Sequence, residues 1–299
     1  MNLARKHYQQ HQAKSAAETA AEFGTMQNTN AYEQQLMQLN SDKNRLKNIQ
    51  SKQNKVELKR QLLPNYKPYI QGILEVKPGV QDAVVTEILV WAIDIDEYDF
   101  ALDLAEYVLK YGLKLPDRFE RSEACFITED IAEAFLKVMK TDVVISEKDF
   151  YQLYRLDDLI NDESLESSKR DMPDEVKAKL YLALGKANMR FITGESELDF
   201  AYAAHAQNFL EKAVKLDDKC GGRTDLNKMT KLFTKLQSVY APLKEQELSD
   251  TTEQPTENNP IEILNPEGTT EQPEATNVLL NQNGTPVVDD HGSMVPTSE

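Results

Sequence analysis

Residues that interrupt helices are scarce in the first 240 positions of this 299-residue sequence. Only 5 of its 12 prolines lie there, and the whole chain has 11 glycines. Between these interruptions apolar residues recur every three or four positions, which is the period of one face of an α-helix. The sequence therefore predicts an all-α protein.

Charge divides the chain into three parts. The formal net charge is −16, yet residues 1–67 carry 11 Lys or Arg against 5 acidic residues. Residues 68–240 and residues 241–299 each carry a net −11. We therefore expect a basic helical arm at 1–67 that meets a polyanion, and a helical-hairpin body at 68–240. The acidic body argues against a second large DNA surface there.

The last part, residues 241–299, is expected to be a disordered acidic tail. It has no aromatic residue and is rich in Glu, Thr, Asn, Pro and Gln. Such a segment buries too little apolar surface to offset the entropy lost on ordering.

Two helices are predicted in the arm. The first spans residues 3–23 and ends at Gly24, and the second runs from Asn30 to about Leu63, where Pro64 and Pro68 end it. An apolar stripe follows one side of the second helix and would lie in water unless it paired, so we expect it to hold a homo-oligomer. Its residues are Leu36, Leu39, Leu46, Ile49 and Val56.

Basic residues lie mostly off that stripe and are the candidate contacts to DNA phosphates. Polar side chains lie between them and are candidates for reading base edges: Asn44, Asn48, Gln50, Gln53 and Asn54. The alternative is a solvated charged helix face. The candidate DNA-binding residues are Arg5, Lys6, Lys43, Arg45, Lys47, Lys52, Lys55, Lys59 and Arg60.

The body contains two similar helical segments. DFALDLAEYVLKYG begins at Asp99 and DFAYAAHAQNFLEKAVKL begins at Asp199, each after an apolar helix and a polar turn. The pattern indicates tetratricopeptide-like hairpins. His205 lies among alanines and is expected in the core. Helix ends are predicted from Gly112, Thr128, Ser146 and Pro173.

Motifs for chemistry are sparse. Cys125 and Cys220 stand alone, and no Gly-rich phosphate loop occurs, so we expect no cofactor. His7 and His11 have metal-competent spacing but no further ligand beside them, so no metal site is expected. Four acids, Asp94, Asp96, Glu97 and Asp99, occur within six residues. We interpret them as turn formers; the alternative is a Mg²⁺ site of an endonuclease, with Asp94, Asp96 and Asp99 as catalytic candidates.

No apolar run approaches the ~18 residues of a membrane span, and the first residues lack the apolar core of a signal peptide. We expect a soluble cytoplasmic protein without a membrane partner.

Three segments resemble the small terminase subunit of temperate tailed phages, the GpM-like group whose members are often named terminase endonuclease subunit. They are KRQLLPNYKPYIQGIL from Lys59, ALDLAEYVLKYGLKLP from Ala101 and MPDEVKAKL from Met172. The resemblance covers roughly residues 3–240 in the same order. Related proteins often end in a basic tail, whereas this tail is acidic. We therefore expect the DNA-binding surface to lie in the arm.

The resemblance implies a role in viral DNA packaging. Such a subunit recognises the packaging, or cohesive-end, site on concatemeric double-stranded DNA, oligomerises, for example as a ring, and delivers the DNA to the large terminase subunit. The large subunit carries the ATPase and usually the nuclease. The implied location is the host cytoplasm, transiently the procapsid portal, and not the mature virion.

Overall fold

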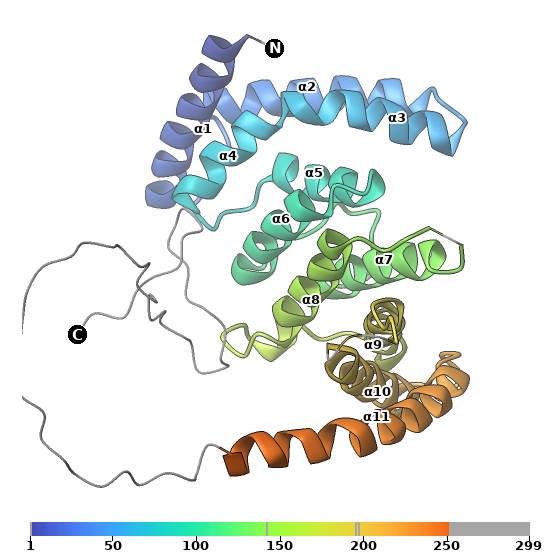
Figure 1. Cartoon of the computed structure of the whole chain (residues 1–299). Helices are drawn as coiled ribbons and strands as arrows, with labels where there is room; N and C mark the ends of the chain where they lie inside the picture. The colour runs from blue at the N-terminus through green and yellow to red at the C-terminus, as the bar shows by residue number, and fades with distance from the viewer. Residues whose placement is uncertain (1, 142, 195, 197, 251–299) are drawn as a thin grey trace, which may run out of the picture. The chain divides into compact units, whose positions relative to one another are not determined.

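The computed structural model describes residues 2–141, 143–194, 196 and 198–250, and within them the chain is all-helical (Figure 1). This confirms the predicted all-α class. Residues 251–299, most of the predicted tail, lie outside the described residues. The α-helices are α1 (Leu3–Phe23), α2 (Asn30–Lys47), α3 (Lys52–Leu62), α4 (Lys67–Val76), α5 (Ala83–Asp94), α6 (Tyr98–Tyr111), α7 (Glu123–Val138), α8 (Glu147–Asn161), α9 (Asp174–Arg190), α10 (Leu198–Leu216) and α11 (Arg223–Asp250); the 3-10 helices are η1 (Leu63–Asn65) and η2 (Ser167–Lys169).

The N-terminal layer consists of α1 to α4. Helix α1 ends at Gly24, as predicted, with that glycine in the left-handed conformation at φ +74°. Small residues let α1 and α4 approach closely, since a Cβ added to Gly72 would lie 2.5 Å from the carbonyl oxygen of Gln10. The buried residues of α1 are the alanines Ala13, Ala16, Ala17 and Ala20.

The predicted single helix from Asn30 to Leu63 is wrong. Helix α2 ends at Lys47, and a new helix begins at Lys52. Ser51 causes the restart, because its side chain accepts a hydrogen bond from the backbone N–H of Asn54 and caps α3. Helix α3 ends at Leu62, two residues before Pro64. Pro68 does not end a helix but lies in the first turn of α4, where its missing N–H costs no helical hydrogen bond.

The body stacks further helices on this layer in chain order, ending with α11 (Figure 1). Helix α5 packs on α6 and α9 packs on α10, so the predicted neighbours meet. Gly185 allows the second contact, because a Cβ there would lie 2.7 Å from Leu210 Cγ. The tetratricopeptide-like arrangement itself stays a prediction.

Three of the predicted helix ends are confirmed. Gly112 terminates α6 in the left-handed conformation, Ser146 forms a capping box with Asp149, and Pro173 immediately precedes α9. The end predicted at Thr128 is wrong. Ser122 caps that helix instead, and Thr128 is fully buried inside α7.

Two further predictions for the body need correction. His205 is exposed rather than in the core, and its Nδ1 lies 3.2 Å from the Tyr154 hydroxyl. The body was predicted to end at position 240, but its last helix, α11, continues through Pro242 to Asp250, over a segment of good helix formers. Among the described residues, every helix is too short or too polar to span a membrane.

Candidate nucleic-acid interface

The turn between α2 and α3 lies at the end of the N-terminal layer that is farther from α1 (Figure 1). Residues 48–51 form this turn, with Asn48, Gln50 and Ser51 exposed to solvent. Polar Gln53 and Asn54 follow in the first turn of α3 and are also exposed. The candidate base-reading side chains therefore gather at one end of the layer, which we call the α2–α3 tip (residues 44–55).

Four of the predicted DNA contacts are occupied by ion pairs inside the protein. Lys43 lies 3.3 Å from Glu87, and Arg45 lies 2.8 Å from Asp42. Lys59 pairs with Asp94. The fourth is Arg60, which pairs with Glu57 at 3.3 Å and also donates to the carbonyl oxygen of Ile95 at 3.3 Å.

The other five candidates, Arg5, Lys6, Lys47, Lys52 and Lys55, form no ion pair with the described residues. Arg5 and Lys6 are exposed near the start of α1. Lys47 and Lys52 are exposed on either side of the turn, and Lys55 is half-buried one helical turn further along. These last three side chains make the α2–α3 tip the cationic end of the layer.

The stripe predicted to hold an oligomer is largely covered within one chain. Leu39 and Leu46 are buried at 2 % and 7 % exposure, and Leu36 and Val56 pack partly buried against the same core. Ile49 is half-buried near the turn. The premise that a single chain leaves this stripe in water therefore fails, and replacing Leu39 or Leu46 by Glu is expected to unfold the layer. A role of the stripe in oligomerisation stays a prediction.

The acidic cluster surrounds the connection between α5 and α6. Asp96 sits in the left-handed conformation at φ +64°, a position that Asp tolerates well, and its carboxylate accepts a hydrogen bond from the Tyr98 hydroxyl at 2.7 Å. Glu97 precedes α6 and lies 3.5 Å from Lys67. These contacts are those of turn-forming residues.

The remaining carboxylates of the cluster have separate partners. Asp94 pairs with Lys59, while Asp99 lies 2.7 Å from Lys148 and accepts from Gln152 at 2.7 Å. Burial opposes ionisation of Asp99, but the Lys148 and Gln152 contacts hold its pKa below the ordinary value. Among the described residues no three His, Cys, Asp or Glu side chains gather as a metal site.

Glu87 of α5 forms contacts that link the N-terminal layer to the body. Both of its carboxylate oxygens accept from Arg118 at 2.7 Å, and Trp91 Nε1 donates to it at 2.9 Å. Lys43 approaches from α2 at 3.3 Å. Burial alone would raise the pKa of Glu87, but the Arg118 guanidinium and Lys43 hold it below the ordinary value. This carboxylate therefore stays charged and fixes α2 against α5.

A hollow of about 1020 Å³ opens beside Asp94 and Asp96 and was not foreseen from the sequence. Its lining carries both signs of charge, including Asp130, Lys137 and Lys140. Burial raises the pKa of Asp130, with the Asp94 charge adding to the effect and Arg121 opposing it. Residues from 93 to 221 line this hollow, so no local pattern in the sequence could have revealed it.

The fold and the charge pattern define an all-helical protein with a basic N-terminal layer on a body of packed helices. Two comparisons identify its family. The sequence profile of the phage small terminase subunit family matches residues 36–174. The chain is also 33 % identical over 217 residues to the "Terminase, endonuclease subunit" of Escherichia phage P2, covering 72 % of this chain and 80 % of that relative.

The chain therefore belongs to the phage small terminase subunit family, which supports a role in a DNA-packaging terminase. The matched residues 36–174 contain the α2–α3 tip and the acidic cluster. No solved structure matches the chain significantly.

Proposed function

We propose that this chain is the DNA-recognising, assembling subunit of a phage DNA-packaging terminase and has no catalytic activity of its own. The observation that carries the proposal is the α2–α3 tip. Three lysines without ion pairs to the described residues, Lys47, Lys52 and Lys55, surround an exposed polar turn in a member of the small terminase subunit family.

Lys47, Lys52 and Lys55 would contact phosphates and release counterions, which makes binding depend on salt but not on sequence. Asn48, Gln50, Gln53 and Asn54 would then reach base edges from the same tip. Asn and Gln side chains can bind adenine through two hydrogen bonds in the major groove. Phosphate contacts would thus set the affinity, and the amide side chains would supply the preference for the packaging site.

Assembly is the second part of the proposal. A homo-oligomer, such as a ring, presents several tips to one DNA molecule, which raises the overall affinity without any new contact in each subunit. The bound DNA would pass to the large terminase subunit in the host cytoplasm and at the procapsid portal. The mass of the native assembly, measured with and without a DNA fragment, tests this part.

DNA binding by the α2–α3 tip is tested with a triple substitution, Lys47→Gln, Lys52→Gln and Lys55→Gln. Each lost phosphate contact lowers the slope of log affinity against log salt by about 0.9, so we expect a loss of up to ~2.7 on every duplex. Lys59 and Arg60 are left in place because their replacement would break ion pairs within the fold.

A matched control removes three positive charges from the body. Lys110, Lys137 and Lys140 are exposed and form no ion pair with the described residues, so their change to Gln should leave the slope unchanged. Equal slopes for the tip variant and the wild type, at equal oligomer mass, would refute the proposed grip.

The name of the phage P2 relative favours a second candidate function, a metal-dependent endonuclease. In that case Mg²⁺ would bind at Asp94, Asp96 and Asp99, and the purified chain would cut cohesive-end DNA without the large subunit. We expect no cutting under these conditions. Cutting that the pair Asp94→Asn and Asp96→Asn abolishes would establish the endonuclease instead.

A further inference from the structure

Helix α11 is the last helix of the stack and packs on α10 along one side (Figure 1). Met229 is buried at 7 % exposure, and Phe233 stacks on Phe200 with 5.1 Å between ring centroids. Leu226 and Leu232 add to this apolar side. The packed side of α11 is therefore defined by residues 226, 229, 232 and 233.

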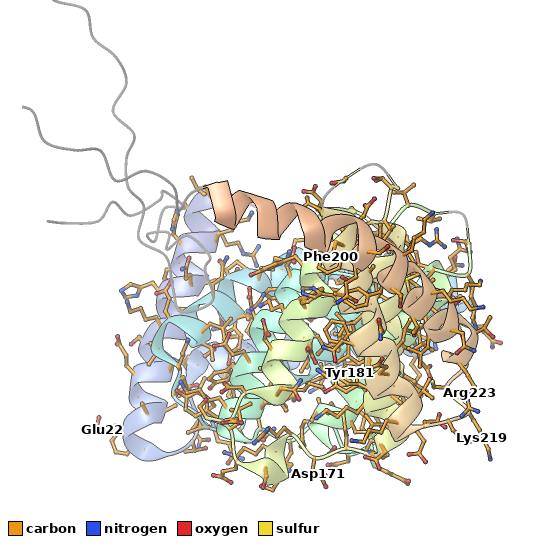
Figure 2. The ribbon with its side chains drawn as sticks, turned by 60° about the horizontal axis from the view of Figure 1, so that its bottom comes forward. Glu22, Asp171, Tyr181, Phe200, Lys219 and Arg223 are labelled. Atoms are coloured by element: carbon orange, nitrogen blue, oxygen red, sulfur yellow. The ribbon has the colours of Figure 1, made fainter. Side chains whose placement is uncertain are left out.

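The opposite side of α11 carries a row of polar and cationic residues. Arg223, Asn227, Lys231 and Lys235 follow one another at intervals of four, so they line one side of the helix, and all four are exposed. We call these four residues the α11 basic row. Figure 2 shows Arg223 and Lys219, from the loop before the helix, pointing away from the body.

Carboxylates are missing from this row. The one acidic residue between positions 223 and 238 is Asp225, which is half-buried and pairs with Lys186 of α9. Lys228 lies 3.8 Å from the same carboxylate. Arg223, Lys231 and Lys235 form no ion pair with the described residues. The positive charges of these three side chains are therefore exposed to solvent and are not neutralised by a described carboxylate.

The spacing of the row suits a long polyanion rather than a small ion. Arg223 and Lys235 are twelve residues apart, which is about 18 Å along a helix. A row of this length carrying separated cations matches the regularly repeated phosphates of a duplex, with exposed Asn227 as a further hydrogen-bonding group. The net −11 of residues 68–240 conceals the row, because that value averages over all faces of the body.

We infer that the α11 basic row is a second contact to the backbone of double-helical DNA, an inference that rests on the proposed DNA-binding role. Helix α11 and the α2–α3 tip lie at opposite ends of the helical stack (Figure 1). The two surfaces therefore contact separate stretches of DNA. Because the row offers charge more than base-reading side chains, its contribution is independent of DNA sequence.

The test is the full-length triple variant Arg223→Gln, Lys231→Gln and Lys235→Gln on a duplex of about 150 bp, roughly one persistence length. We expect the salt slope to fall by up to ~2.7 on any sequence. Between 50 and 200 mM salt, this means that the wild type loses about 40-fold more affinity than the variant. The charge-preserving variant Arg223→Lys, Lys231→Arg and Lys235→Arg should behave as the wild type.

Chemical acetylation of lysines in the wild-type protein reports which individual lysines the bound DNA covers. DNA should protect Lys231 and Lys235 from acetylation but leave Lys110 of the body reactive. A loss of slope in the α2–α3 tip variant, together with an unchanged slope in the α11 variant and no protection of Lys231, would overturn this inference alone. Unchanged slope in the tip variant with a reduced slope in the α11 variant would instead refute the tip as the grip.

Discussion

Individual carboxylates in this protein are held by very different surroundings, and those surroundings decide their role. Glu87 is buried against the Arg118 guanidinium, the Trp91 indole N–H and Lys43. Asp99 and Asp199 begin similar sequence segments, yet the two side chains differ in burial. Asp199 is 1 % exposed and accepts from the backbone N–H groups of residues 193, 194 and 196. Asp99 is half-exposed and pairs with Lys148.

Glu87→Gln should lower the free energy of unfolding by about 2–3 kcal/mol at pH 7, because Arg118 and Lys43 lose their charged partner. The folded-state pKa of Glu87 lies below its ordinary value of 4.5, so its charge stabilises the fold above that pH. The difference between variant and wild type should shrink as pH falls below 4.5. Urea unfolding measures both effects, with Glu57→Gln, an exposed pair expected to cost under ~0.5 kcal/mol, as the control.

Asp157 on α8 has the opposite shift. Burial, with Asp158 nearby, raises its pKa from 3.8 to about 6, although Lys212 and Lys177 oppose the change. The folded state thus holds this proton more tightly, so stability is lost as pH rises from about 3.8 to 6. Asp157→Asn should stabilise the protein at pH 7.5 by at most about 3 kcal/mol.

The contribution of Asp157 is separable because the variant keeps its main contact. Asn161 donates to the Asp157 Oδ1 at 2.7 Å, and an asparagine can accept the same bond. Thermal melts at pH 4 and pH 7.5 should show the gain only at the higher pH. A gain of equal size at both pH values, or from Asp158→Asn at the exposed neighbour, would contradict this explanation.

At the scale of elements, the close approach of α1 to α4 holds the N-terminal layer together. Alanines on α1 and Gly72 on α4 bring the backbones near each other, and a Cβ at Gly72 would also meet Ala13 Cβ at 2.8 Å. The predicted helix α1 therefore depends on a glycine far away in the sequence. Backbone atoms cannot move aside as the end of a long side chain can, so the contact tolerates no added atom.

Gly72→Ala should destabilise the protein by about 1–3 kcal/mol, although alanine favours helices by about 1 kcal/mol over glycine. The cost arises because α1 must move away from α4. Denaturant unfolding measures it, and Gln71→Ala on the exposed side of α4 serves as the control. Equal stability of the Gly72 variant and the wild type would show that the layer can loosen without cost.

At the scale of the whole molecule, the compact unit ends at Asp250. It includes α11, whose last residues lie beyond the boundary predicted at position 240. The basic layer belongs to this unit too, because α2 packs on α5 and Lys43 reaches Glu87. The helices of the arm and the body thus support one another.

A chain ending at Asp250 should therefore keep its fold. We expect circular dichroism to show the same helical content per molecule as the full chain, and the melting temperature to differ by less than about 2 °C, equivalent to at most about 1 kcal/mol for a domain of this size. A chain ending at Gly222 is the contrasting variant, since it exposes the apolar side of α10 and should melt lower. Equal melting of both truncated chains would contradict the assignment of α11 to the core.

Local features of the fold were predictable from the sequence. The helical period, the left-handed glycine at Gly112 and the capping box at Ser146 each depend on residues within a few positions, so a short segment contains the whole cause. The family resemblance was also carried by contiguous segments, and the comparisons confirm it. The basic character of the first 67 residues is likewise a property of composition alone.

The helical class, most helix ends and the basic arm could thus be predicted from local patterns of residues. Which cations form ion pairs depends instead on how the helices pack: Lys59 pairs with Asp94, 35 positions away, whereas Lys52 pairs with no acid among the described residues. This packing also buries Leu39 within a single chain and turns the α11 basic row away from the core. Burial and ion pairing depend on distances between residues that packing brings together, and no local pattern in the sequence encodes those distances.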